Sequence, residues 1–379
     1  MKIYLDNAAT TRVDPRVKKE IDTFLDKNYA NPSSVHVMGF EAKKALDGAR
    51  EKIAKAIGAK SKELIFTGSG TEANNFFLKG LFFQHYPEKY HIVTTEIEHD
   101  CVLNACKWLE SKGAKVTYLK VDQEGFIDLK ELEDAITDKT VVVSIIHGNN
   151  EIGTIQDLKK ISDVCKKKNV LFHSDACQSF TKVPINVVED GIGLMTINAH
   201  KIHGQKGVGG LYIKEGIKIN PLLHGGGQEF GLRSSTENIP GIVGFAKAVE
   251  IASAKDIKQM EKLRDYFINK ITKVQNVRLN GPKKENRLCN NINLSFFMLE
   301  GELVRDKLSK KGICVSTGSA CSSSSTDVSH VMKAINCPME YLHGNLRLSL
   351  SKWTTKEELD KAFNEIKKIV EENSMNLVQ

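Results

Sequence analysis

Several short turns, each of which follows an apolar run, carry the residues with the clearest capacity for chemistry. The first is the stretch 68–75, GSGTEANN, in which Gly68 and Gly70 precede Thr71 at the start of a helical run. Free backbone N–H groups, a hydroxyl and the positive end of a helix dipole would together hold a phosphate group. The stretch also fits a G-x-G-x-x-A dinucleotide fingerprint, with Glu96 as the ribose-binding acid. A third interpretation is that Thr71 is an ordinary helix cap after a glycine turn.

A carboxylate and a lysine follow two later apolar runs. Asp175 ends the run VLFHSD, and Gln178 comes three residues later. An acid at the carboxyl end of a buried strand can pair with a cationic ring nitrogen, although it could equally cap a loop. Lys201 follows the strand end at Asn198, in a turn that contains four glycines. A lysine held there can form an imine with an aldehyde cofactor, and the glycines permit close approach to it.

The order of these motifs favours one cofactor over the other. His99, in EHD, and Asn150, in NNEIG, also stand in loops after apolar runs. A pyridoxal phosphate site needs a phosphate cup, an acid for the pyridine nitrogen, a ring to stack on the cofactor and a Schiff-base lysine, and the chain supplies all four in turn. The dinucleotide interpretation explains only the first. His200 and His203 form an H-x-x-H pair without a third ligand nearby, so we predict no metal site.

These turns require an α/β architecture to bring them together. Six short apolar runs alternate with amphipathic helical patterns, at residues 63–67, 91–95, 115–119, 141–146, 170–175 and 194–198. Continuous apolar runs between helices indicate a buried, mainly parallel sheet with helices on both faces. After about residue 256 a charged helix leads into alternating segments near Val277, NINLSFF, GICVST and LRLSLS, and then into a last helix at 355–372. This change of pattern predicts a smaller α+β domain.

Length and composition exclude several other classes of protein. A chain of 379 residues, 41% hydrophobic and 27% charged, is typical of a globular protein with two domains. No apolar run approaches the roughly 18 residues of a membrane span, and the N-terminal MKIYLDNAATTR lacks the apolar core of a signal peptide. The net charge of +7 comes from scattered lysines without a nucleic-acid-binding motif, and the eight cysteines form no C-x-x-C ladder. We therefore expect a cytoplasmic protein with no membrane or nucleic-acid partner.

Ten motifs give the chain a resemblance that covers nearly its whole length. In order, they are YLDNAATT, YANPSSVH, GTEANN, EIEHD, HGNNEIGTIQD, DACQ, AHKIHGQKGVGGLY, RSSTEN, GSAC and LRLSLS. Together they resemble a pyridoxal phosphate-dependent cysteine desulfurase of the nitrogenase/iron-sulfur-cluster type, in the class V aminotransferase family. The resemblance implies fold type I of the pyridoxal phosphate-dependent transferases. It places a large domain with a mainly parallel seven-stranded sheet at residues 14–252, and a small domain at residues 1–13 and 253–379.

The resemblance also assigns roles to individual residues. Lys201 would be the Schiff-base lysine, and His99 would stack on the cofactor and act as acid and base. Asp175 would pair with the pyridine nitrogen, while Gln178 would donate to the phenolic oxygen. The other implied roles are phosphate binding by Gly70, Thr71, Asn198 and His200, joined by Thr236 from the neighbouring subunit of a homodimer; binding of the substrate carboxylate by Arg347 with Asn150, which also contacts the cofactor; and sulfur acceptance by Cys321.

The segment around Cys321 suits a sulfur carrier. Residues 315–330 are mostly Ser, Gly and Thr, which have little to bury, so we expect Cys321 on a mobile loop. A cysteine is otherwise a small buried apolar group. We expect packing roles for Cys106, Cys165, Cys289 and Cys314, and also for Cys101 and Cys177, which lie next to site motifs.

Three positions depart from the family pattern. Asn198 replaces the usual serine, Gln205 the usual proline after the lysine, and Ser235 the usual glycine before Thr236. An asparagine amide can still contact a phosphate, so the departures affect fine geometry more than chemistry.

The implied reaction is the conversion of L-cysteine to L-alanine, with the sulfur left as a persulfide on Cys321. The persulfide would pass to an acceptor such as an iron-sulfur scaffold protein. The alternative within the enzyme class is a selenocysteine lyase or another class V aminotransferase-like enzyme, in which Cys321 would be less essential. A sulfur-relay protein that only binds partners would not need Lys201, Asp175 and His99 together.

Overall fold

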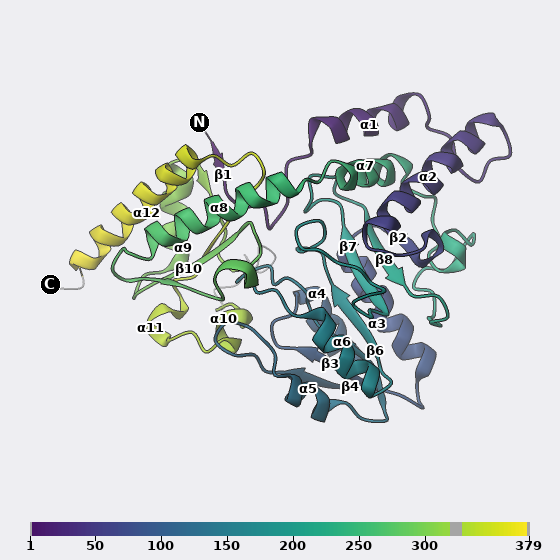
Figure 1. Ribbon diagram of the computed structural model, residues 1–379, viewed down its shortest axis with the longest axis horizontal. Helices are drawn as coiled ribbons and strands as arrows, with labels where there is room; N and C mark the ends of the chain where they lie inside the picture. Colours follow the sequence, from purple (N-terminus) through teal and green to yellow (C-terminus); the bar gives the residue numbers. More distant parts are fainter. Residues whose placement is uncertain (1, 319–327, 377–379) are drawn as a thin grey trace.

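A seven-stranded sheet forms the centre of the larger part of the molecule (Figure 1). In this computed structural model, which describes residues 2–318 and 328–376, the strand order is β2-β8-β7-β6-β5-β3-β4. The strands are β2 (Leu64–Thr67), β3 (His91–Thr95), β4 (Lys115–Leu119), β5 (Thr140–Ser144), β6 (Leu171–Asp175), β7 (Leu194–Asn198) and β8 (Gly209–Ile213). Only β8 runs antiparallel to its neighbours. The predicted mainly parallel sheet is therefore confirmed.

Helices cover both faces of this sheet, because successive residues of a strand point to opposite sides. Val143 packs into one apolar cluster and its neighbour Val142 into another. The helices of the first cluster are α1 (Pro15–Asp26), α2 (Val37–Ala56), α5 (Leu129–Ala135), α6 (Leu158–Lys167) and α7 (Ile239–Glu250). Those of the second are α3 (Gly70–His85) and α4 (Asp100–Glu110). The doubly covered sheet explains why its strands read as continuous apolar runs.

The parallel strands bring the turns that follow them to one edge of the sheet. Strands β6 and β7 are neighbours, with Asp175 paired in register with Thr196. Asp175 ends β6 and Asn198 ends β7, so the turn that carries Lys201 begins beside Asp175. In open α/β sheets a ligand crevice lies at this carboxyl edge.

The smaller part has its own sheets and core. Strands β12 (Leu346–Ser349), β10 (Asn291–Phe296) and β9 (Val277–Leu279) form an antiparallel sheet in that order, while β1 (Ile3–Tyr4) pairs in parallel with β11 (Ile313–Cys314). The helices of this part are α8 (Ala254–Ile271), α9 (Gly301–Lys310), α10 (His330–Ala334), α11 (Met339–Leu342) and α12 (Lys356–Asn376). Its α+β composition agrees with the prediction, while the exact domain limits stay a prediction.

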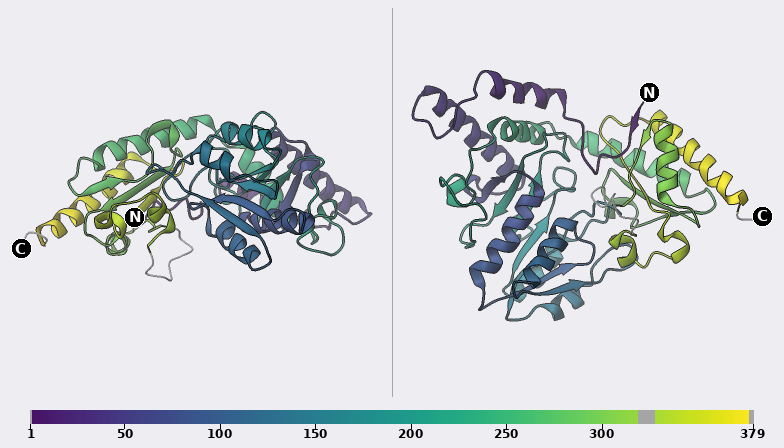
Figure 2. Two further views of the ribbon diagram at one scale, coloured as in Figure 1. Left: turned by 90° about the horizontal axis from the view of Figure 1, so that it is seen from below. Right: turned by 180° about the vertical axis from the view of Figure 1, so that it is seen from behind.

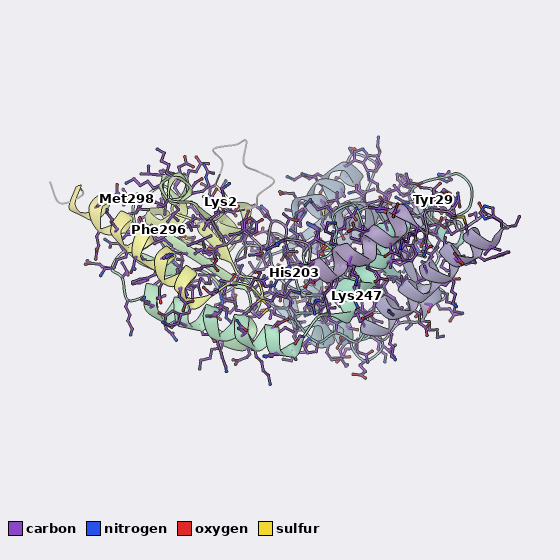
Figure 3. The ribbon with its side chains drawn as sticks, turned by 90° about the horizontal axis from the view of Figure 1, so that it is seen from above. Lys2, Tyr29, His203, Lys247, Phe296 and Met298 are labelled. Atoms are coloured by element: carbon purple, nitrogen blue, oxygen red, sulfur yellow. The ribbon has the colours of Figure 1, made fainter. Side chains whose placement is uncertain are left out.

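The two parts lie side by side, and α8 leads from the larger one into the smaller one (Figures 1 and 2). Figure 3 shows His203 between them, with Phe296 in the smaller part and Tyr29 at the far end of the larger part. Residues of the N-terminal segment, including Ile3 and Leu5, belong to the core of the smaller part. Within the described ranges, no helix combines the length and apolar character needed to cross a membrane.

Candidate active site

A cavity of about 210 Å³ lies at the carboxyl edge of the large sheet. Ten of the predicted site residues line it: Gly70, Thr71, His99, Asn150, Asp175, Gln178, Asn198, His200, Lys201 and Arg347. Thr236 is not among its lining residues, and Cys321 lies outside the described part of the chain. The cavity therefore brings together residues from both halves of the sequence.

The turn between β2 and α3 forms one wall. Ser69 is the N-cap of the 16-residue helix α3, because its hydroxyl accepts a hydrogen bond from the Glu72 backbone N–H at 3.0 Å. The cap is thus Ser69 and not Thr71, which lies in the first turn and faces the cavity. A Cβ on Gly70 would lie 2.6 Å from the Sγ of Cys177, so only glycine fits there. The helix start leaves backbone N–H groups for an anion.

Asp175 is buried at the end of β6 with two donors around it. The Nδ2 amide of Asn74 donates to its Oδ2 at 2.7 Å, and the backbone N–H of Cys177 donates to its Oδ1 at 2.8 Å. These contacts fix the plane of the carboxylate at the cavity wall. Gln178, one turn further on, donates through Nε2 to the Ala8 carbonyl at 2.9 Å.

Lys201 lies in the turn after β7, close to two backbone carbonyls. Its Nζ donates to the carbonyl of Ala9 at 2.7 Å and also to that of Ala8. Burial, assisted by the positive charge of Arg347, lowers the pKa of Lys201 to about 8. By the ordinary titration relation, about one-tenth of such amines are uncharged at pH 7, far more than for an exposed lysine. Lys201 is therefore the best nucleophilic amine of the cavity.

His200, beside Lys201, is held neutral. Its Nδ1 is 3.1 Å from the hydroxyl of Thr10, and its carbonyl accepts a hydrogen bond from the Thr11 backbone N–H at 3.0 Å. Burial, with the nearby charges of Lys201 and Lys206, lowers the pKa of His200 to about 3. At neutral pH it can offer an N–H donor without adding a charge.

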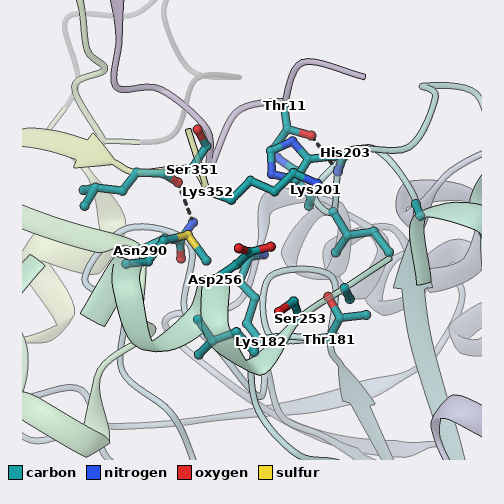
Figure 4. A pocket seen from close by; sticks show the side chains of 16 residues that line it. Thr11, Thr181, Lys182, Lys201, His203, Ser253, Asp256, Asn290, Ser351 and Lys352 are labelled. Carbon is teal, nitrogen blue, oxygen red and sulfur yellow. Dashed lines mark hydrogen bonds between the residues drawn. The ribbon is translucent and has the colours of Figure 1, made fainter. Parts of the chain in front are cut away.

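Lys201 also lines a second cavity, of about 50 Å³, shown in Figure 4. In its wall the His203 backbone N–H donates to the Thr11 hydroxyl at 2.9 Å, and Lys352 pairs with Asp14 at 2.6 Å. The first contact holds the turn that carries Lys201 against the N-terminal segment, and the second joins Lys352 to the same segment.

Arg347 reaches the first cavity from β12 of the smaller part. It is 1% exposed, donates through Nη1 to the Asn150 carbonyl at 3.0 Å, and pairs through Nη2 with Asp6 at 3.2 Å. Its Nε is buried and has no hydrogen-bond partner among the described residues. Arg347 lines the cavity, and a guanidinium there suits a carboxylate ligand.

His99 is the N-cap of α4, and its Nδ1 accepts a hydrogen bond from the Cys101 backbone N–H at 3.1 Å. The thiol of Cys101 lines the cavity together with Asn74 and Cys177. Sequence reasoning assigned Cys101 and Cys177 to packing and did not name Asn74. A usable signal was the position of Asn74 four residues after Gly70, which places both on one face of α3.

The loop that contains Thr236 is fixed to helices α2 and α3 by two ion pairs. Arg50 of α2 binds both carboxylate oxygens of Glu229, at 2.6 and 2.7 Å, and both side chains are almost fully buried. Arg233 binds Glu72 of α3 at 2.7 Å. This loop lies next to the turn that forms the cavity wall, although Thr236 itself does not line the cavity.

A family model described as aminotransferase class-V matches residues 3–362. Proteins named cysteine desulfurase IscS from Dictyoglomus turgidum and Methanosarcina thermophila are 48% and 44% identical to the chain, over 98% and 97% of its length and 95% and 92% of theirs. Among solved structures, a NifS-like protein has a TM-score of 0.92 and 41% identity, covering 98% of this chain and all of its own. A structure titled SspA in complex with cysteine has a TM-score of 0.84 and 36% identity, covering 94% of this chain and all of its own.

Proposed function

This chain belongs to the aminotransferase class-V family, and from that premise we propose how its residues carry out the reaction of a cysteine desulfurase. The activity is that of a pyridoxal phosphate-dependent cysteine desulfurase, which converts L-cysteine to L-alanine and supplies sulfur for iron-sulfur cluster assembly. The assignment of roles rests on one observation above all. A lysine with a lowered pKa, a buried carboxylate and a helix N-terminus meet in one cavity.

The residues of the cavity fit pyridoxal phosphate. Gly70, Thr71, Asn198 and His200 lie where a phosphate could use the N-terminus of α3, and no Cβ at position 70 obstructs it. Asp175, Gln178 and His99 would hold the ring through its pyridine nitrogen, its phenolic oxygen and its face, with Asn150 beside it. Lys201 would hold the aldehyde carbon. When bound, the cofactor supplies an electron-withdrawing ring that stabilises negative charge on the substrate.

The chain's own groups then bind the substrate and move its protons. Arg347, which lines the cavity, would bind the carboxylate of L-cysteine, and the carbonyl of Asn150 would keep the guanidinium in place. The uncharged amine of Lys201 would take a proton at Nζ, since its pKa is close to the working pH. His99, on the other wall, would act as the second acid-base group.

We assign sulfur acceptance to Cys321, and the flanks of its segment support this. The Gly318 backbone N–H donates to Asn345 at 3.0 Å on one side, and the Ser329 hydroxyl donates to Glu151 at 2.6 Å on the other. Glu151 follows Asn150 directly, so the end of the segment at Ser329 lies beside a cavity residue. The persulfide would then pass to an acceptor protein such as an iron-sulfur scaffold.

A homodimer would complete the site. Thr236 lies on a well-anchored loop but outside its own cavity, which is consistent with a phosphate contact in the neighbouring subunit. Exposed apolar side chains are also frequent along residues 25–40, and such a concentration of them is typical of a protein interface. They are Leu25, Tyr29, Val35, Val37, Met38 and Phe40, and Tyr29 is visible in Figure 3.

The test uses the purified enzyme with cofactor, L-cysteine and a thiol reductant. Sulfide and alanine should form in equal amounts, and Lys201→Ala should form neither while also losing the visible absorbance of the bound cofactor. Lys214→Ala, which removes an exposed lysine directly after β8, should behave as the wild type. Turnover by Lys201→Ala at the wild-type rate would refute the assigned role of this lysine, and failure of the wild type would refute the function.

A further inference from the structure

Cys101 touches two residues of the active site but has no part in the roles assigned so far. It lies in the first turn of α4, partly exposed, at the wall of the main cavity. Its Sγ is 3.2 Å from Nδ2 of Asn74 and 3.1 Å from Nδ1 of His99. Asn74 in turn donates to Asp175. A continuous chain of contacts thus joins His99, Cys101, Asn74 and Asp175.

The direction of each hydrogen bond in this chain follows from its acidic end. The carboxylate of Asp175 can only accept, so Asn74 must turn its Nδ2 towards it. The second hydrogen of that amide then points to the sulfur of Cys101, which accepts. The thiol hydrogen is left to donate to the Nδ1 of His99.

The backbone also donates a hydrogen bond to Nδ1 of His99. The N–H of Cys101 donates to the same Nδ1 at 3.1 Å, as the helix cap requires. A neutral imidazole has one nitrogen that accepts and one that carries the hydrogen. With two donors directed at Nδ1, the hydrogen of neutral His99 must be on Nε2.

We propose that Cys101 is a positioning residue that, with Asn74, links His99 to Asp175 and holds the His99 ring in its Nε2–H tautomer. The inference rests on the proposed function only in so far as His99 and Asp175 act on the cofactor. As a consequence, one shared set of hydrogen bonds would orient both the imidazole that stacks on the face of the cofactor ring and the acid that pairs with its pyridine nitrogen.

Three variants separate this role from simple packing. Cys101→Ser keeps a group that can accept from Asn74 and donate to His99, whereas Cys101→Ala keeps neither. Cys106→Ala is the matched control, since Cys106 is fully buried on the same helix and does not line the cavity. Cys106→Ala should lower stability through lost packing without changing the tautomer of His99.

The primary measurement is nitrogen NMR of ¹⁵N-histidine-labelled, cofactor-free protein, with the His99 signals assigned by His99→Gln. Wild type, Cys101→Ser and Cys106→Ala should show an unprotonated Nδ1 and a protonated Nε2. In Cys101→Ala the ratio of the two tautomers should shift towards Nδ1–H by about threefold or more, the equivalent of one lost hydrogen bond. In the loaded enzyme, kcat should fall severalfold for Cys101→Ala with KM for L-cysteine unchanged, and Cys101→Ser should restore it.

An unchanged tautomer ratio in Cys101→Ala would overturn the proposal, whatever happens to the rate. Equal losses of kcat in the serine and alanine variants would overturn it too, because the polar contacts would then be irrelevant. The ring measurement needs neither cofactor nor turnover, so it stands apart from the test of the desulfurase function. If the wild type released no sulfide, the desulfurase function would be rejected, and the tautomer measurement would still decide the proposal for Cys101.

Discussion

Removing the buried side chain of Arg50 should strongly destabilise the larger part of the molecule. Its guanidinium donates to both oxygens of Glu229 and, at 2.7 Å, to the Leu64 carbonyl, and it lies 4.6 Å from the centre of the Phe66 ring. The side chains of Arg50 and Glu229 are only 6% and 1% exposed. In Arg50→Ala the carboxylate of Glu229 stays buried with a single remaining donor, the Phe66 backbone N–H at 2.8 Å.

The expected cost is that of an uncompensated buried charge. Breaking a buried ion pair from one side costs about 3–5 kcal/mol, while replacing both partners with apolar residues is often close to neutral. Arg50→Leu with Glu229→Leu should therefore be less destabilised than Arg50→Ala. The Lys52–Glu250 pair offers a matched control on the same helix, because its side chains are 59% and 41% exposed. Lys52→Ala should leave the free energy of unfolding nearly unchanged.

The assay is urea unfolding of cofactor-free protein at one fixed protein concentration, so that neither ligand nor association shifts the equilibrium. A loss of less than about 1 kcal/mol in Arg50→Ala, the level of an exposed pair, would refute the reasoning. The reasoning would also be refuted if the loss of unfolding free energy in the double variant equalled the sum of the losses in Arg50→Leu and Glu229→Leu, since the two side chains would then be energetically independent.

Two further predictions concern the site, and a third concerns a buried acid. Arg347→Lys should raise KM for L-cysteine about tenfold or more without changing the cofactor spectrum, because an ammonium cannot bind a carboxylate bidentately; steady-state kinetics would contradict this by giving an unchanged KM. Cys321→Ser should keep the cofactor but release no sulfide, and intact mass after brief exposure to L-cysteine should show added sulfur on the Cys321 peptide of the wild type alone; sulfide release at the wild-type rate would favour direct expulsion from the substrate. Burial raises the pKa of Glu98 to about 8, above its ordinary 4.5, so folded protein keeps a proton that unfolded protein has lost between these values. Stability should thus fall as pH rises through that window, by at most about 1.4 kcal/mol per pH unit, and Glu98→Gln should flatten the profile in urea titrations; parallel profiles for the two proteins would count against a protonated Glu98.

Six of the seven strands of the large sheet could be predicted from the sequence to within two residues, whereas the antiparallel strand β8 is not among the predicted apolar runs. The runs 91–95, 115–119 and 194–198 coincide with β3, β4 and β7. Strands β3 and β7 are buried along their whole length, which favours continuous apolar runs, whereas β4 is an edge strand and is partly exposed. The run 141–146 corresponds to β5, which already ends at Ser144. Ile146 is as apolar as its neighbours, but its N–H leaves the sheet to donate to Glu98. Hydropathy alone cannot predict that this N–H bonds to a side chain instead of a neighbouring strand.

The contacts that shape the site could not be predicted in the same way. Asn74 and Asp175 are 101 positions apart, and Arg50 and Glu229 are 179 apart. The first pair is formed by the docking of α3 onto the sheet and the second by the docking of a loop onto α2, and no local periodicity marks either of them. The motif order could indicate which residues gather in the cavity, but not that a thiol would stand between His99 and Asn74. The cap of α3 shows the same limit on a smaller scale, since Ser69 and Thr71 are both good capping residues by type and only the backbone decides between them.

The N-terminal segment has a consequence for the order in which the protein matures. Ile3 pairs with Ile313, and the Asn7 amide donates to the Ser349 carbonyl. The carbonyls of Ala8 and Ala9, directly after Asn7, accept hydrogen bonds from the amine of Lys201. Residues 3 and 7 are therefore held in part by residues that lie more than 300 positions later in the sequence. Closing so long a loop is slow and late compared with forming the helices. During translation, the surroundings of Lys201 are thus completed only after residues 313 and 349 have been added to the chain, so acquisition of the cofactor would report that both parts of the chain have already folded.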